Sequence, residues 1–112
     1  MGAEIAKVAA PAFKKISLEM GGKNPNIIFA DCNYDKMLST TVRSSFANQG
    51  QICLCGSRIF VEKSIYNKFK ADFVERTNKL KVGHPSDDTS NLGAIVSKTH
   101  YEKVLSLSLI HI

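Results

Sequence analysis

The sequence lacks the features of a membrane or secreted protein. It has no tryptophan and only three cysteines and three prolines in 112 residues. No apolar run approaches the roughly 20 residues that a membrane-spanning helix needs, so a membrane protein is not expected. The first residues carry Glu4 and no long apolar core, which argues against a signal peptide. Ala6 stands where myristoylation wants Ser or Thr.

The cysteines are too few and too irregular for a disulfide framework or a metal site. Cys32, Cys53 and Cys55 are an odd number, and the last two form C-x-C rather than C-x-x-C. No second pair or nearby histidine completes a zinc site, so we expect no metal. Without a secretory signal, the pattern favours reduced thiols in an intracellular, cytoplasmic setting.

The chain has an excess of positive charge, but its basic residues do not cluster. Fifteen Lys and Arg against ten Asp and Glu give a net charge of +5. The basic residues are scattered among acids without interleaved aromatics, so nucleic-acid binding is not expected. The excess indicates a solvated surface or the basic part of a larger protein. The length allows one domain at most, with a modest core.

Hydrophobic periodicity predicts an α/β fold. The order is helix, strand, strand, helix, strand, helix, which indicates some parallel sheet. Helical spacing covers 3–12, alternation covers 15–19, and β-branched runs mark strands at 26–30 and 59–61. The predicted caps of the later helices are Asp31 or Asn33, Ser64 and Ser97.

The last eight residues differ from the rest. Residues 105–112, L-S-L-S-L-I-H-I, alternate apolar and polar side chains and break the helical period. As a free end, that alternation would form an unprotected edge strand. We interpret the segment as a non-native tail, and a functional tail is the alternative.

The segment 46–58, F-A-N-Q-G-Q-I-C-L-C-G-S-R, carries the candidate nucleophile. Gly50 permits turn geometry that other residues avoid, and small residues follow the cysteines. A thiol in such an open turn can be reactive when its thiolate is favoured, whereas a lone cysteine is more often an inert core residue. The spacing does not separate Cys53 from Cys55.

A candidate base lies upstream in L-E-M-G-G-K, residues 18–23. Glu19 ends an apolar stretch before two glycines, and partial desolvation there would suit a general base. The alternative is a glutamate in solvent or paired with Lys23. His84, His100 and His111 have no ligand spacing and are interpreted as surface residues.

Together the two segments resemble the glutamate motif and the G-Q-x-C cysteine motif of the aldehyde dehydrogenase superfamily. They occur in order, 34 residues apart (53 − 19), and the likeness covers residues 2 to about 104. It implies a fold in which residues 1–20 end a Rossmann-like NAD-binding domain. Residues 21–104 would begin the α/β catalytic domain, which is incomplete here, and 105–112 would be the tail.

The resemblance also implies roles for single residues. Cys53 would attack an aldehyde to give a thiohemiacetal and then a thioester, with its backbone amide in the oxyanion hole. Glu19 would activate the water that hydrolyses the thioester. The backbone of Met20 and Gly21 would lie by the nicotinamide of NAD, and NADP stays open. The substrate would be a small-molecule aldehyde, and full-length members are homo-oligomeric.

Some features of the family have no match in this chain, and they leave other functions open. The family's cofactor loop and oxyanion-hole asparagine match nothing in this chain. We therefore expect a fragment of an NAD-dependent aldehyde dehydrogenase that does not turn over aldehyde alone. A non-catalytic fold or interaction module is one alternative, and a redox-sensing thiol protein using Cys53 and Cys55 is another.

Overall fold

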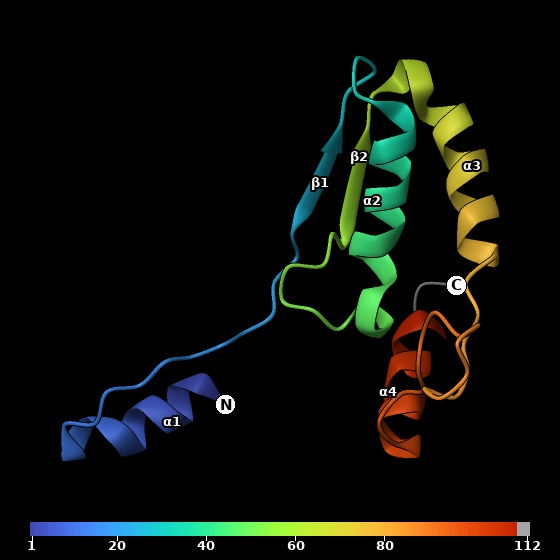
Figure 1. The fold of residues 1–112 in the computed structure, drawn as a ribbon. Coiled ribbons are helices and arrows are strands. Elements are labelled where there is room, and N and C mark those ends of the chain that lie inside the picture. The colour runs from blue at the N-terminus through green and yellow to red at the C-terminus, as the bar shows by residue number, and fades with distance from the viewer. Residues whose placement is uncertain (110–112) are drawn as a thin grey trace.

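The computed structural model describes residues 1–109 and has a mixed α/β architecture (Figure 1). Its helices and strands, in chain order, are α1 (Gly2–Ala9), the 3₁₀ turn η1 (Ala10–Ala12), β1 (Pro25–Ile28), α2 (Tyr34–Phe46), the 3₁₀ turn η2 (Ala47–Gly50), β2 (Arg58–Val61), the 3₁₀ turn η3 (Lys63–Ile65), α3 (Tyr66–Asn78) and α4 (Lys98–Leu109). Among the described helices, none combines the length and the apolar composition that crossing a bilayer requires.

A β1–α2–β2 unit forms the centre of the fold. The two strands pair in parallel, with Pro25 opposite Arg58 and Ile28 opposite Val61. Parallel strands need a crossover connection, and α2 supplies it by returning the chain along one face of the sheet (Figure 1). The expected parallel sheet is therefore confirmed, as are strands near 26–30 and 59–61.

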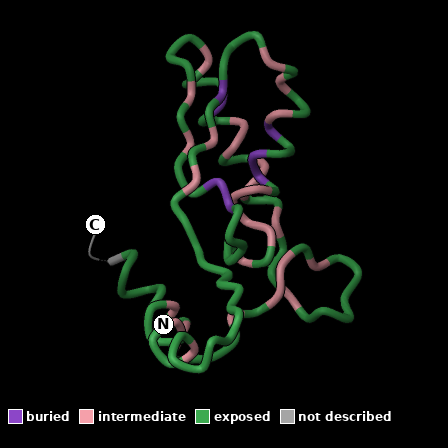
Figure 2. The backbone as a smooth tube through the Cα atoms, turned by 90° about the vertical axis from the view of Figure 1, so that its left-hand side faces the viewer, coloured by how far each residue is buried: buried purple, intermediate pink, exposed green. Residues whose placement is uncertain are grey.

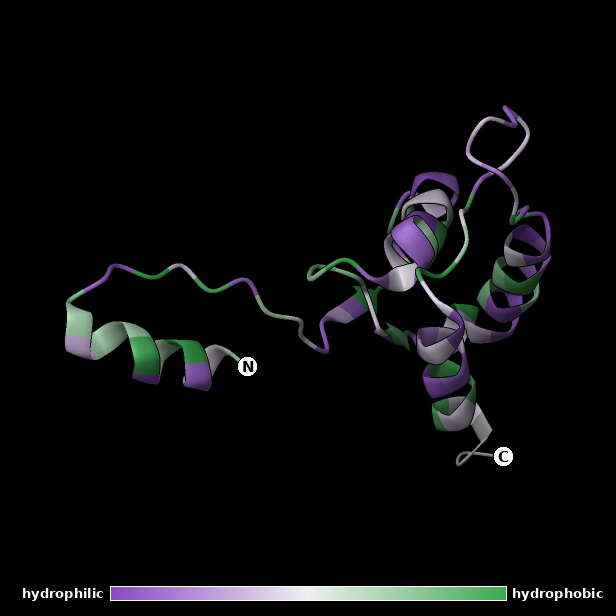
Figure 3. Ribbon diagram, turned by 90° about the horizontal axis from the view of Figure 1, so that it is seen from below, coloured by the Kyte–Doolittle hydropathy of each residue, from purple (hydrophilic) through white to green (hydrophobic). Residues whose placement is uncertain are grey.

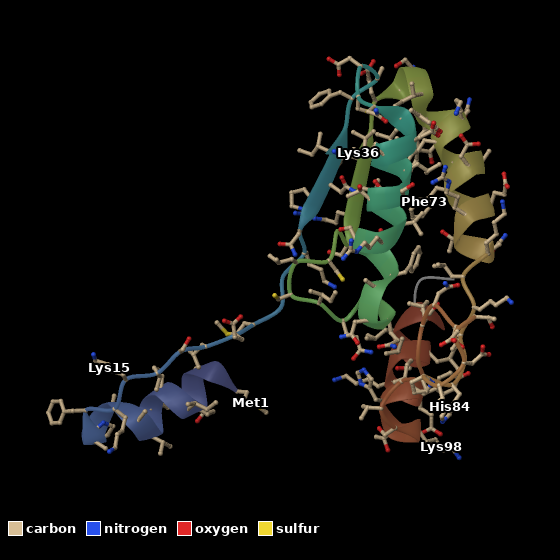
Figure 4. All side chains as sticks on the ribbon, viewed as in Figure 1. Met1, Lys15, Lys36, Phe73, His84 and Lys98 are labelled. Atoms are coloured by element: carbon tan, nitrogen blue, oxygen red, sulfur yellow. The ribbon has the colours of Figure 1, made fainter. Side chains whose placement is uncertain are left out.

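The core lies between the sheet, α2 and α3. Ile28, Leu38 and Phe69, one from each of these elements, are buried together. Phe73 stacks on Phe69 at 5.3 Å and reaches Phe46 at 5.9 Å between ring centroids. Figure 4 shows Phe73 on the side of α3 that faces α2. The buried stretches in Figure 2 lie in this body of the molecule.

Polar contacts fix the helix ends and the α2–α3 contact. The Asn33 side chain caps α2 by accepting from the Lys36 amide at 3.1 Å, as expected. Tyr34 donates to Asp72 at 2.7 Å, and Lys68 donates to the same carboxylate at 2.8 Å. These two hydrogen bonds hold the pKa of Asp72 below its ordinary value.

Two expected elements differ in the structure. Ser64 does not cap α3 but lies within η3, where its hydroxyl donates to Glu62 at 2.7 Å. No strand forms at 15–19, because no neighbouring strand lies beside that segment in the described part of the chain. An alternating pattern cannot by itself supply the ladder hydrogen bonds that make a strand.

The C-terminal helix extends further than the sequence pattern indicates. Ser97 caps α4 through the His100 amide at 3.2 Å, as predicted. Residues 105–109 continue this helix, so the expected break at Leu105 is wrong for them. Ser106 donates to the Lys103 carbonyl at 2.7 Å, a local bond that lets serine fit a helix interior. Residues 110–112 of the expected tail lie outside the described residues.

The N-terminal arm stands apart from this body. Helix α1 passes into η1, which ends at a left-handed Phe13 (φ 52°), and the chain then runs back as an extended strap, defined here as residues 14–24. Figures 1 and 3 both show α1 and the strap beside the sheet rather than on it. No residue of α1 or η1 is buried. The side chains of Leu18 and Met20 lie near Gly2, so the strap lies against the start of its own helix.

Candidate functional site

The parallel pairing of β1 and β2 brings the two sequence motifs together. The strap precedes β1, and the cysteine segment precedes β2. Because the two strands run in the same direction and Pro25 lies opposite Arg58, the residues before them enter the sheet at the same end. Glu19 and Cys53, which are 34 positions apart (53 − 19), therefore come from neighbouring segments.

A left-handed turn leads into the cysteines. Asn48, Gln49 and Gly50 have φ values of 50°, 57° and 72°, three successive residues in a region that side chains disfavour. A Cβ on Gly50 would lie 3.0 Å from the Ser45 carbonyl oxygen, so only glycine fits without displacement. Non-glycine residues held in such geometry often occur at functional sites.

Burial separates the two thiols that the sequence could not. Residues 52–55 form a tight turn, here called the cysteine turn, closed by the Cys55 amide donating to the Ile52 carbonyl at 2.9 Å. Cys53 is exposed on this turn, whereas Cys55 is 7 % exposed. Gly56 is anchored under it by a 3.0 Å hydrogen bond from its amide to the Ser44 hydroxyl. Cys53 is therefore the more accessible of the two thiols.

Asn24 joins the strap to the cysteine turn. Its side-chain nitrogen donates to the Cys53 carbonyl at 2.7 Å and to the Cys55 carbonyl at 3.2 Å. Arg58 adds two contacts, donating from its backbone amide to the Asn24 carbonyl at 3.2 Å and from Nε to the Lys23 carbonyl at 3.0 Å. Asn24 is not among the residues expected at the site, because its two partners lie 29 and 31 positions away in the sequence.

A solvent-open depression of about 420 Å³ contains both candidate catalytic residues. Strap and cysteine turn form its two walls. Its lining comprises Glu19, Met20, Gly21, Gly22, Lys23, Gly50, Gln51, Ile52, Cys53, Cys55 and Ser57. Glu19 is exposed, so the partial desolvation considered for its carboxylate is absent here. Neither does Lys23 form an ion pair with it among the described residues.

A second depression, about 410 Å³ in volume, lies on the α2 side of the same turn. It is mostly apolar and shares Ile52 and Cys55 with the first. Its lining residues are Thr40, Arg43, Ser44, Ala47, Ile52, Leu54 and Cys55. Cys53 lines the first depression, and its neighbours Ile52 and Cys55 line both.

The other candidates stay outside this region. His84 accepts from the Ser86 amide at 3.2 Å in an exposed loop, His100 belongs to α4, and His111 is not among the described residues. Within residues 1–109, no three His, Cys, Asp or Glu side chains gather as metal ligands would. The shifted pKa values also lie elsewhere: hydrogen bonds from Ser64 and the Ala30 amide lower the pKa of Glu62, which follows β2 at the opposite end of the sheet.

Comparison with known proteins places these features in a wider group. Residues 1–110 match the Aldehyde dehydrogenase family. Among curated proteins, the chain is 62% identical over 102 residues to human 2-aminomuconic semialdehyde dehydrogenase and 60% identical over 105 residues to the mouse protein. A 2-aminomuconic 6-semialdehyde dehydrogenase from a Pseudomonas species is 43% identical over 105 residues.

These matches cover most of this chain but little of the relatives. The human alignment includes 91% of this chain and 21% of that protein, and the mouse alignment 94% and 22%. The chain thus spans about a fifth of the length of the curated relatives it matches. Among solved structures, betaine aldehyde dehydrogenase from Staphylococcus aureus in complex with NAD⁺ superposes with a TM-score of 0.88 and 37% identity, over 96% of this chain and 21% of that one.

Proposed function

Because the chain belongs to the aldehyde dehydrogenase family, we propose that it carries the nucleophile and the base of an enzyme that oxidises an aldehyde to a carboxylic acid with NAD. Cys53 is the nucleophile and Glu19 the base. The observation that carries this proposal is the shared depression: two segments far apart in sequence present Glu19 and an exposed Cys53 to the same hollow, while Cys55 is buried.

The chemistry of the two residues follows from their side chains. The Cys53 thiolate adds to the carbonyl carbon of the aldehyde and forms a thiohemiacetal. Loss of hydride from that carbon leaves a thioester on Sγ. Glu19 takes a proton from water as the water adds to the thioester, and the acid departs with Cys53 restored as a thiol. The Cys53 amide donates to no acceptor within the described residues, so it is free to bind the oxyanion.

The backbone of the strap offers an open surface against which a planar ring can lie. A Cβ at Gly21 would meet no atom within 4 Å, so the main chain between Met20 and Gly22 lies open along one wall of the depression. NAD, when bound, supplies the hydride acceptor for this reaction. Met20 and Gly21 would lie against its nicotinamide by their backbone. NADP is the alternative cofactor, since none of these contacts reaches the ribose.

The substrate we favour is a semialdehyde of the muconic type. This rests on the names of the relatives, which include 2-aminomuconic and 2-hydroxymuconic semialdehyde dehydrogenases at 43–62% identity. The apolar depression on the α2 side of Cys53 offers a surface for the hydrocarbon part of such a molecule. Three free cysteines are consistent with the cytoplasmic location that we propose.

We also retain the proposed domain limits, with residues 1–20 ending a cofactor-binding domain, 21–104 beginning the catalytic domain, and 105–112 as a tail. The absence of buried residues in α1 and η1 supports a boundary near the strap. The alternative of a thiol redox protein has less support, because burial of Cys55 removes the partner that Cys53 would need for facile disulfide exchange. A non-catalytic module stays the other alternative.

Acyl transfer tests the nucleophile without any cofactor. The purified chain is treated with p-nitrophenyl acetate, whose acetyl group passes to a thiolate as nitrophenolate leaves. Peptide mapping by mass spectrometry should locate the acetyl group on Cys53, with little on Cys32 or Cys55. Cys53→Ser should abolish the early release of nitrophenolate. Equal acetylation of all three thiols, or no loss in Cys53→Ser, would contradict the assignment.

Turnover by the 112-residue chain is a separate question. We expect no NADH from the chain with NAD and an aldehyde, because the depression is open to solvent and supplies no enclosure for the reaction. Absorbance of NADH measures this directly. Sustained formation of NADH by the pure chain, lost in Cys53→Ser, would refute the expectation and strengthen the assignment.

A further inference from the structure

We propose that Asn24 is a positioning residue for Cys53: its carboxamide fixes the orientation of the cysteine turn toward the strap that carries Glu19. The proposal rests on the assignment of Cys53 as the nucleophile. Asn24 touches neither the reacting sulfur nor the carboxylate by any hydrogen bond, so it would act through the backbone on which the thiol stands.

The contact uses the full donor capacity of the side chain. Nδ2 carries two hydrogens, and it donates one to the Cys53 carbonyl at 2.7 Å and one to the Cys55 carbonyl at 3.2 Å. Asn24 is half-buried and lies 29 and 31 residues from these partners. One carboxamide thereby bridges the two carbonyls on either side of Leu54.

These bonds determine the backbone around the nucleophile. The peptide between Ile52 and Cys53 is already fixed, because its carbonyl accepts from the Cys55 amide at 2.9 Å. The carbonyl of the next peptide, Cys53–Leu54, accepts within the described chain from Asn24 alone. A planar trans peptide directs its N–H opposite to its C=O. With both adjoining peptides held, the direction of the Cys53 Cα–Cβ bond is set.

Asn24 is itself held on the other side. Its carbonyl accepts from the Arg58 amide at 3.2 Å, and the Lys23 carbonyl accepts from Arg58 Nε at 3.0 Å. The end of the strap is thus anchored to the start of β2, and the side chain of Asn24 carries that anchor to the cysteine turn. Strap and turn form one hydrogen-bonded unit with Asn24 at its centre.

The same contact affects the charge that the thiol experiences. The two amide hydrogens carry positive partial charge and offset the carbonyl dipoles next to Cys53. Removing them leaves those carbonyls uncompensated, which disfavours a nearby thiolate. An aspartate at position 24 would add a full negative charge. Its carboxylate oxygens would also face the Cys53 and Cys55 carbonyl oxygens, which are acceptors themselves. Asn24→Leu and Asn24→Asp should therefore act in the same direction, with Asp the stronger.

The test is the rate at which iodoacetamide alkylates Cys53 as a function of pH, with peptide mapping to follow each cysteine separately. We expect the midpoint of the profile to move upward by roughly 0.5–1 pH unit in Asn24→Asp, and by a smaller amount in Asn24→Leu. Asn26→Leu is the matched control. Asn26 also donates through its carboxamide, to the Thr41 hydroxyl at 3.1 Å, but makes no hydrogen bond to residues 52–55 in the described chain.

A merely structural role would lower the stability of all three variants without moving the midpoint. An unchanged midpoint in folded Asn24→Asp and Asn24→Leu, or an equal shift in Asn26→Leu, would overturn the proposal. A measurement on the unsubstituted chain guards against variants that do not fold: the side-chain amide protons of Asn24 should exchange with solvent about tenfold more slowly than those of exposed Asn67. Equal exchange would also overturn it.

The outcome is distinguishable from failure of the proposed function. If the midpoints shift but Cys53 takes no acetyl group from p-nitrophenyl acetate, the positioning stands and the nucleophile assignment fails. If Cys53 is acetylated while the midpoints do not move, the assignment stands and the positioning role fails.

Discussion

Gly50→Ala perturbs the backbone that delivers Cys53 to the surface. Gly50 has φ of 72°, where an L side chain is strained, and an added Cβ would lie 3.0 Å from the Ser45 carbonyl oxygen. Left-handed geometry costs a non-glycine residue about 1–2 kcal/mol. The close approach to a main-chain oxygen adds to this, since backbone cannot swing away as a side chain can. We expect a loss of about 1–3 kcal/mol in the free energy of unfolding.

Gly21→Ala is the matched control for this substitution. A Cβ at Gly21 meets no atom within 4 Å, and its φ is not positive. Both substitutions lower the conformational entropy of the unfolded chain by the same amount, so this effect on stability cancels when the two variants are compared. Urea unfolding followed by circular dichroism gives the two free energies. If Gly50→Ala loses no more stability than Gly21→Ala, the left-handed turn described before Cys53 is wrong.

Two further predictions concern the body of the fold. Leu38→Ala should lower the free energy of unfolding by about 2–5 kcal/mol, because Leu38 is 2 % exposed at the centre of the core. Ile27→Ala, at a side chain that is 60 % exposed, should change it far less. Similar losses for the two variants in urea unfolding would contradict the assigned core. Asp72 should make the chain sensitive to acid. Its pKa is lowered by the bonds from Lys68 and Tyr34, so its contribution is fully present above the unfolded value of about 3.9 and is lost as pH falls through the folded value. The stability difference between the unsubstituted chain and Asp72→Asn, measured in urea, should shrink between pH 7 and about pH 2, and a constant difference would rule out this linkage.

The body of the fold could be predicted from sequence because its patterns are local. The apolar face of α2 repeats at helical spacing, and this face buries Leu38, Thr41 and Val42. Asn33 and Ser97 cap helices through side-chain bonds to amides three residues ahead, a relation that sequence displays directly. The parallel strands then follow from the helix between them.

The errors arise where structure depends on a distant partner. Residues 15–19 alternate like a strand, yet a strand exists only beside another strand. The serines and leucines after Lys103 alternate too, but the helical backbone of α4 is already propagating there and absorbs them. Ser64 has the side chain of a helix cap, but its hydroxyl donates to the Glu62 carboxylate instead of accepting from a helix amide.

The candidate site shows the same division. Spacing and composition left Cys53 and Cys55 equivalent, and the resemblance to a family selected Cys53. In the structure the two differ in burial: the Gly56 amide donates to the Ser44 hydroxyl of α2, the neighbouring Cys55 is buried, and Cys53 is exposed on the turn. Asn24 could not be found from sequence, since its partners lie 29 and 31 residues away.

The most direct test of Glu19 and Cys53 as a base and nucleophile is the lifetime of an acetyl group on Cys53. After reaction with p-nitrophenyl acetate and removal of excess reagent, mass spectrometry follows the loss of acetyl from the Cys53 peptide. Glu19→Gln keeps the shape of the side chain and removes the base, and Glu75→Gln on α3 controls for loss of an exposed carboxylate elsewhere. We predict that Glu19→Gln prolongs the lifetime roughly 10–100-fold while Glu75→Gln leaves it unchanged. Equal lifetimes in the unsubstituted chain and Glu19→Gln would contradict the pairing.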